Sequence, residues 1–238
     1  MSSIEVNGQS GDSLERILQV ATVLFAEHGY HGVSTRTIAS AVGLNVSTVN
    51  YHAGSKPDLY RQVFRRLFMR EYELVSTFTA CVGDDLVRDR EAVRTLLEHL
   101  VDALVDMSVE NPEVPRLWVR RWLERELCFD EIEVEFSLPL YAMVRDLLER
   151  ARQAGTIRAS GPDVRLFLIS FTWMLYGYFT GGPIPLNAAR ADPFDPDQIA
   201  AFKAFLHDYV RHLLGLDARQ ASALNRSEAS SPITGPSF

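Results

Sequence analysis

The side chains of this chain that are best suited to chemistry lie between Val33 and Leu59, in two short stretches on either side of Gly43. Most of them carry hydroxyl, amide, imidazole or basic groups, which can hydrogen-bond to base edges and phosphates. The chemistry that they indicate is recognition of DNA and not bond cleavage. The candidate contact residues are Thr35, Arg36, Thr37, Asn45, Val46, Ser47, Thr48, Asn50, Tyr51, His52 and Lys56.

The same stretch predicts two short helices joined by a tight turn. Thr35 is a suitable N-cap for a helix that begins at Arg36, and Ile38 and Ala39 fall on the face that turns toward a core. Gly43 then permits the left-handed backbone that ends a helix abruptly. This layout is typical of a helix-turn-helix, whose second helix enters a DNA major groove.

Lys56 stands just before Pro57, which reads as the first residue of the next helix. A lysine beside the free N–H groups of a helix N-terminus can bind a phosphate. We therefore expect Lys56 to contact the DNA backbone, whereas the helix of residues 46–52 lies in the major groove, where its outer side chains can reach base edges or phosphates. His52 suits packing or a phosphate contact, and Val46 suits either a structural role or contact with a thymine methyl group.

Two motifs in this region resemble the tetracycline-repressor (TetR) family: I-A-S-A-V-G-L at residues 38–44 and V-N-Y-H-A-G-S-K at residues 49–56. The resemblance runs from Arg16 to Arg61, or about 45–50 residues. Two positions depart from the family pattern. Asn50 replaces the usual Tyr, which changes the set of base or phosphate donors, and Ala53 replaces a bulky apolar residue, which predicts looser packing behind the second helix.

The rest of the chain reads as helices. Apolar residues from Leu14 to Phe25 follow a helical period, and Asp12 with Glu15 suits a capping box at the start. After the two short helices, further helices are predicted near 57–80, 89–109, 113–128, 134–154, 163–180 and 196–214, with breakers between them. No strand pattern competes, so the fold class is all-α with about nine helices, the number that the resemblance implies.

The predicted organisation has four parts. Residues 1–11 form a flexible N-terminus, residues 12–58 a three-helix DNA-binding domain with the helix-turn-helix, residues 59–216 a larger helical domain, and residues 217–238 a disordered tail rich in Ser, Ala and Pro. The resemblance implies that the larger domain binds an effector and forms a dimer.

An uncharged apolar segment runs from Leu166 to Gly182. A membrane span is the first alternative, but polar residues dilute the segment and no basic anchors follow it. A helix that is apolar all round is otherwise buried on every side. The resemblance implies that this helix and the last one form a two-fold dimer interface, with Leu168, Leu175, Phe179, Phe202, Phe205, Leu206, Tyr209 and Leu213 as candidates.

The larger domain also offers aromatic and flexible side chains for an effector pocket, although ordinary core packing explains any single one of them better. The candidates are Trp118, Trp122, Phe136, Tyr141, Met143, Phe167, Phe171, Trp173 and Tyr176. Basic residues that alternate with acids in the same region indicate a solvated, salt-bridged face: Arg116, Arg120, Arg121, Glu124, Arg125 and Glu126.

The net charge of −7 is unusual for a DNA-binding protein, but residues 1–80 carry 7 Lys/Arg and 7 Asp/Glu, so the acidic excess lies in the remainder. Attraction to DNA must therefore be local.

The two cysteines, Cys81 and Cys128, lack His partners at ligand spacing. The polar start of the sequence lacks the apolar core of a secretory signal. We expect a soluble cytoplasmic protein without a metal or a cofactor.

An enzyme is a remote alternative. Gly11-Asp12-Ser13-Leu14 spells the G-D-S-L block of a hydrolase family, but the preceding residues are polar, and Asp208 and His212 have the wrong spacing for the rest of its triad. The stronger alternative is a non-enzymatic helical protein that uses the N-terminal motif for contact with a protein partner. The leading hypothesis is a transcriptional regulator that binds palindromic DNA as a homodimer, and the resemblance implies that it is most often a repressor. A small-molecule effector would release it from the DNA by tilting the long helix that begins near Pro57.

Overall fold

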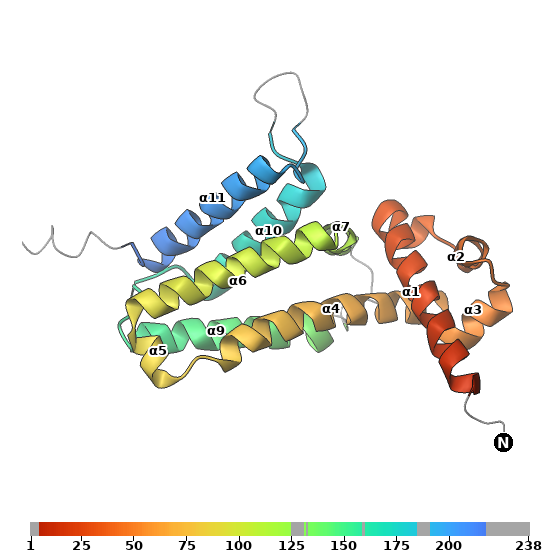
Figure 1. The fold of residues 1–238 in the computed structure, drawn as a ribbon, viewed down its shortest axis with the longest axis horizontal. Coiled ribbons are helices and arrows are strands. Elements are labelled where there is room, and N and C mark those ends of the chain that lie inside the picture. The colour runs from red at the N-terminus through yellow and green to blue at the C-terminus, as the bar shows by residue number, and fades with distance from the viewer. Residues whose placement is uncertain (1–4, 125–130, 132, 159, 185–190, 218–238) are drawn as a thin grey trace, which may run out of the picture.

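The computed structural model describes residues 5–124, 131, 133–158, 160–184 and 191–217, which contain ten α-helices, one π-helical turn and no strand. This confirms the all-α fold class. Figure 1 shows a small group of helices, α1 to α3, beside a larger group. The long helix α4, Lys56–Ala80, runs from the small group into the larger one.

The small group contains α1 (Glu5–Gly32), α2 (Thr35–Val42) and α3 (Val46–Ala53). Helix α1 begins before Asp12, so the predicted capping box is wrong, as is the placing of residues 5–11 before the first helix. That stretch contains two glycines but no proline, and a glycine weakens a helix by only about 1 kcal/mol. The N-cap of α2 is Ser34 and not Thr35, because the Ser34 hydroxyl accepts the Thr37 N–H.

A buried aromatic cluster joins α1 to α4. The rings of Phe25 and Tyr60 meet edge to face with centroids 5.0 Å apart, and Phe64 lies 4.9 Å from Tyr60. Gly43 adopts the predicted left-handed conformation (φ 77°) at the end of α2, and the Arg16 guanidinium of α1 donates to the Val42 carbonyl beside it at 3.1 Å. The turn between α2 and α3 is therefore held from both its backbone and α1.

The larger group contains α5 (Asp84–Arg88), α6 (Arg90–Glu110), α7 (Glu113–Leu123), a π-helical turn (Glu133–Ser137), α9 (Leu138–Gln153), α10 (Val164–Gly181) and α11 (Pro196–Leu214). Each of the nine predicted helices has a counterpart. Helix α5 was not predicted, because five residues carry too little periodicity to be recognised. The last part of the predicted helix 113–128, with Cys128, and the tail 218–238 lie outside the described residues.

Helix α10 turns an apolar face inward with Phe167, Phe171, Leu175 and Phe179, all buried within one chain. Within the described part of the chain, no helix is both long enough and apolar enough to cross a bilayer.

The burial corrects part of the predicted dimer interface. The predicted residues Leu175, Phe179, Phe202 and Leu206 pack inside the chain and do not lie on an outer surface. Helices α10 and α11 pack against α6 and α7 within the same chain. This packing buries the apolar faces from which the dimer interface was predicted.

Candidate nucleic-acid interface and ligand cavity

Helix α3 presents a polar face to solvent. Ser47 and Asn50 are exposed and the Tyr51 ring is 83% exposed, whereas Val49 and Ala53 on the opposite side are buried. A large aromatic ring left in water is available to a partner. Of the other predicted contact residues, Arg36, Thr37 and Asn45 are exposed, and Thr35, Val46, Thr48, His52 and Lys56 are half-buried.

Asn45 and Thr48 hold the start of α3. The Asn45 side-chain oxygen accepts the Thr48 backbone N–H at 2.8 Å and the Thr48 hydroxyl at 2.9 Å. Their polar groups are therefore engaged in capping the helix. Contact with DNA by these two residues stays a prediction, and Ser47, Asn50 and Tyr51 offer the less encumbered polar groups.

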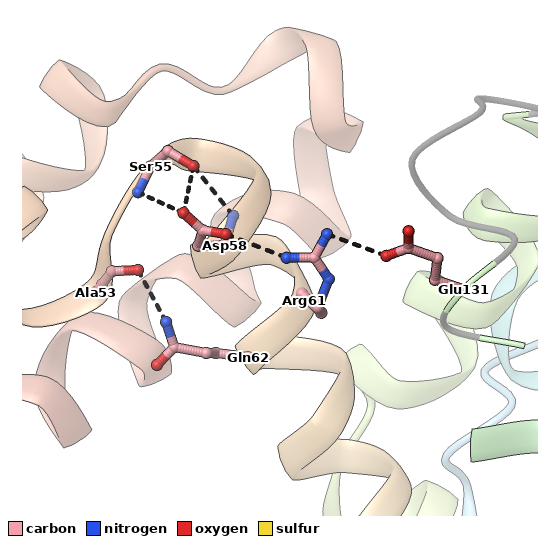
Figure 2. A network of polar contacts seen from close by, with 6 residues as sticks. All are labelled: Ala53, Ser55, Asp58, Arg61, Gln62 and Glu131. Carbon is pink, nitrogen blue, oxygen red and sulfur yellow. Dashed lines mark hydrogen bonds and ion pairs between the residues drawn. The ribbon is translucent and has the colours of Figure 1, made fainter. Parts of the chain in front are cut away.

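A polar network ties the end of α3 to the start of α4 (Figure 2). Ser55 and Asp58 form a capping box, and the Gln62 amide donates to the Ala53 carbonyl at 2.8 Å. Hydrogen bonds from the Ser55 side chain and backbone, helped by the nearby Arg61 guanidinium, lower the pKa of Asp58. The N-cap is Ser55, so helix α4 begins at Lys56 and not, as predicted, at Pro57.

The Lys56 ammonium lies 4.1 Å from the centroid of the Tyr30 ring. This cation–π contact places the amine between the N-terminus of α4 and the end of α1. Tyr30 in turn meets Tyr60 edge to face at 5.0 Å, so the lysine packs on the aromatic cluster that joins α1 to α4. Contact of this amine with a DNA phosphate stays a prediction.

Helix α7 holds the end of α1. The Arg120 guanidinium donates to the Ala26 carbonyl at 2.8 Å and to the Glu27 carbonyl at 2.6 Å, and Glu124 accepts the Tyr30 N–H at 3.4 Å. The solvated face predicted for the basic residues of this region is wrong for Arg120 and for the buried Arg121. The alternation of basic and acidic residues in the sequence does not reveal which basic side chain donates to the free carbonyls near the end of α1, a helix far away in the sequence.

Gly29 explains why α1 can be held there. It interrupts α1 with φ 71° and ψ 173°, a conformation that favours glycine. A Cβ atom at this position would lie 2.5 Å from the Glu124 carboxylate. The absence of a side chain therefore lets α7 approach the α1 backbone.

The larger group of helices encloses a cavity of about 90 Å³, to which α4, α6, α7, α9, α10, α11 and the π-helical turn contribute side chains. One water molecule needs only about 10–15 Å³ on the same measure, so the cavity has room for a small organic molecule. Its lining residues include the predicted Trp118, Trp122, Tyr141, Phe167, Phe171 and Tyr176.

Two predicted pocket residues, Met143 and Trp173, are not among the lining residues, and the Phe136 side chain lies outside what the structure describes. Trp173 is partly exposed and packs against Trp122 with centroids 4.6 Å apart. Leu168 and Leu175, predicted for the dimer interface, line the cavity instead. Helical periodicity identifies the apolar face but not which neighbour each residue meets.

Sequence reasoning missed the polar centre of this cavity, Glu71 on α4. Its carboxyl oxygen Oε1 accepts the Trp118 indole N–H at 2.7 Å and the Tyr176 hydroxyl at 2.8 Å. Burial raises the pKa of Glu71 to about 7, although the hydrogen bonds from Tyr176 and Trp118 act to lower it. One signal of its burial was present in the sequence: Glu71 lies at a helical spacing from the apolar residues Leu67, Phe68 and Val75, on the same face of the helix.

The sequence matches the family model described as bacterial regulatory proteins, tetR family, over residues 17–63. The HTH-type transcriptional repressor AcnR of Corynebacterium glutamicum is 32% identical over 160 residues, which cover 67% of this chain and 77% of that protein. The HTH-type transcriptional repressor KstR2 of Rhodococcus jostii is 27% identical over 186 residues, covering 75% and 84% of the two chains. The solved structure of the ketosteroid transcriptional regulator KstR2 of Mycobacterium tuberculosis superposes with a TM-score of 0.61 at 16% identity, covering 87% of this chain and 95% of that one.

The chain belongs to the TetR family of bacterial transcriptional regulators. It is therefore a DNA-binding regulator of transcription and not an enzyme, which confirms the prediction from the two N-terminal motifs. The matched residues 17–63 include α2, α3 and the buried face of α1, so the helix pair around Gly43 is the family's helix-turn-helix. Ser13 of the G-D-S-L block lies inside α1 and does not follow a strand.

Proposed function

We propose that this protein is a ligand-responsive repressor that acts in the cytoplasm, binds an inverted-repeat operator as a homodimer and leaves the DNA when a small molecule fills the cavity of the larger domain. Two copies of α3 would occupy successive major grooves about 34–36 Å apart. The exposed polar face of α3 and the repressor names of the curated relatives support this proposal.

The observation that carries the proposal is the double role of α7. On one side its residues Trp118 and Trp122 line the cavity, and on the other Arg120 and Glu124 grip the end of α1. A ligand that pushes the two indole rings outward must move α7. Because Arg120 and Glu124 hold the α1 backbone, α1 and the helix pair packed against it move too. Coupling of about 1–3 kcal/mol is enough for a regulatory switch.

An exposed apolar stripe supports the homodimer. On α10, Leu166, Ile169 and Trp173 are exposed at spacings of three and four residues, and Phe205 of α11 is 53% exposed. Contiguous exposed apolar side chains mark interaction surfaces. Of the interface residues predicted from sequence, Phe205, Tyr209 and Leu213 remain candidates, since none of them is buried within the chain or lines the cavity. We propose that α10 and α11 pair with their symmetry copies across this stripe.

The proposal is tested by incubating the purified protein with random-sequence duplex DNA and sequencing the bound fraction. We expect enrichment of an inverted repeat whose half-sites are about one helical turn apart, with affinity that falls steeply as salt rises. The measurement is repeated with candidate effectors added. If the protein shows no salt-dependent DNA binding either with or without them, the proposal is contradicted and contact with a protein partner is favoured.

A further inference from the structure

Glu71 is the charged side chain of the cavity lining that the structure describes. Among the described lining residues it alone carries a formal charge when ionised, and the remaining polar groups are the hydroxyls of Ser137, Tyr141, Thr172 and Tyr176 and the indole N–H groups of Trp118 and Trp122. The Glu71 residue is 6% exposed. A buried carboxylate is costly unless it meets an opposite charge or a full set of hydrogen bonds.

The partners that the structure gives to Glu71 do not supply that charge. Trp118 and Tyr176 are neutral donors, and both meet the same oxygen, Oε1. Among the described residues, the other oxygen, Oε2, is therefore the one left to meet a ligand. No cation is among the causes of the shifted pKa of Glu71, which are burial and these two hydrogen bonds.

The aromatic rings around the carboxyl group are suited to a cation as well. Trp118 and Trp122 lie with ring centroids 6.3 Å apart, and Trp122 and Tyr176 with centroids 5.9 Å apart. The faces of Trp and Tyr rings attract cations, and the attraction strengthens where water is excluded. A carboxylate beside such rings, in an otherwise apolar cavity, recognises one chemical class best.

We propose that the cavity binds a small lipophilic amine, whose ammonium group pairs with Glu71 while its apolar part packs between the aromatic rings. This inference rests on the proposed function, because it names the chemical class of the effector. The same pairing reaches the DNA-binding domain, since Glu71 belongs to α4 and its partner Trp118 to α7.

The test uses three probes of similar size that differ in charge: phenethylamine, phenethyl alcohol and phenylacetate. Binding to the full-length protein is measured by calorimetry at about pH 8, where the amine is still protonated and Glu71 is mostly ionised. We expect the amine to bind at least about tenfold more tightly than the alcohol and the phenylacetate to bind least. Equal affinity for amine and alcohol, or no binding of any probe, would overturn the proposal.

Two variants locate the effect. Glu71→Gln should abolish the preference for the amine and leave affinity for the alcohol nearly unchanged, whereas Glu73→Gln, at an exposed position on the same helix, should preserve the preference. A preference that survives in Glu71→Gln would overturn the assignment of Glu71.

The wild-type protein provides a readout that does not depend on whether the variant folds. As pH rises through about 7, the pKa of Glu71, affinity for the amine should increase while affinity for the alcohol does not. The only other titratable groups facing Glu71 from the cavity wall are the tyrosines Tyr141 and Tyr176, within the described residues. Burial raises the pKa of Tyr176 well above its ordinary value, and a tyrosine normally titrates only near about pH 10. A flat amine profile would contradict the proposal.

A failure of the proposed ligand class can be told apart from a failure of the proposed release of DNA. If phenethylamine binds through Glu71 but does not release operator DNA, the ligand class stands and the release mechanism fails. If operator DNA is released by a ligand that Glu71→Gln still binds normally, the release mechanism stands and the ligand class fails.

Discussion

Glu71 of α4 and Trp118 of α7 are joined by a 2.7 Å hydrogen bond from the indole N–H to the carboxyl oxygen Oε1. The bond connects the helix that follows the helix-turn-helix with the helix that grips the end of α1. Because both residues line the cavity, a ligand bound there, as proposed, would compete with or reinforce the link between the two helices.

Removing the Arg120 guanidinium should uncouple the two domains. In Arg120→Ala the carbonyls of Ala26 and Glu27 lose their donor, so we expect a loss of stability of about 1–3 kcal/mol in urea unfolding. Ligand binding to the cavity should persist, while ligand-induced release of DNA becomes weaker. The control is Arg116→Ala, at an exposed position on α7. Equal effects of the two substitutions would rule out a specific role for Arg120.

Stability without ligand should depend on pH through Glu71. Burial raises its pKa from 4.5 to about 7 in the folded protein, so the unfolded chain releases the proton first. The contribution of Glu71 to the free energy of unfolding should be highest below about pH 4.5. It should fall by about 3 kcal/mol in total between about pH 4.5 and 7, and stay at that lower level above pH 7.

Urea unfolding of the wild type and of Glu71→Gln across this range measures the effect. The difference in the free energy of unfolding between the two proteins should shift in favour of the Gln variant as pH rises from about 4.5 to about 7. A difference that does not change with pH would show that Glu71 stays ionised in the folded protein.

Two substitutions at the DNA-binding domain should act differently. Lys56→Ala should weaken binding to all duplexes and reduce the salt dependence by about one phosphate contact, whereas Asn50→Ala should change preference among sequences. Lys203→Ala, in α11, serves as the control for loss of a positive charge. Gel-shift titrations at several salt concentrations measure both effects, and a uniform loss caused by Asn50→Ala would remove it from the base-contacting set.

A charge in the apolar stripe of α10 should separate the proposed dimer. In Ile169→Glu we expect monomers in sedimentation and a loss of operator affinity, because a buried unpaired charge in an interface is strongly unfavourable. Leu138→Glu alters an exposed leucine of α9 and should leave assembly intact. If Ile169→Glu remains dimeric, the interface lies elsewhere.

Local signals explain what the sequence could predict. The helix-turn-helix has a Gly at the turn and apolar residues at fixed spacing, all within a short stretch, so its place and its exposed face were predictable, although the N-cap of α2 is Ser34 and not the predicted Thr35. Long-range partners were not. The Arg120 contact spans 94 residues, and Glu71 meets Tyr176 across 105, so nothing near either residue in the sequence indicates its role.

The same limit explains the mistaken dimer residues. Helix α10 is apolar on most of its surface, so its pattern could not separate Leu175, which faces the cavity, from Ile169, which faces outward. Only the packing of α6 and α7 against α10 decides which side remains free.

The length of α4 has a mechanical consequence. Fifteen residues separate Glu71 from Lys56 along this one uninterrupted helix, a lever arm of about 22 Å at 1.5 Å per residue. If α4 pivots by only about 5° at the cavity, its far end swings by about 2 Å, and the two copies of α4 in the proposed homodimer, moving in opposite directions, would change their spacing by about 4 Å. A displacement too small to open the core would thereby be amplified into one larger than the length of a hydrogen bond.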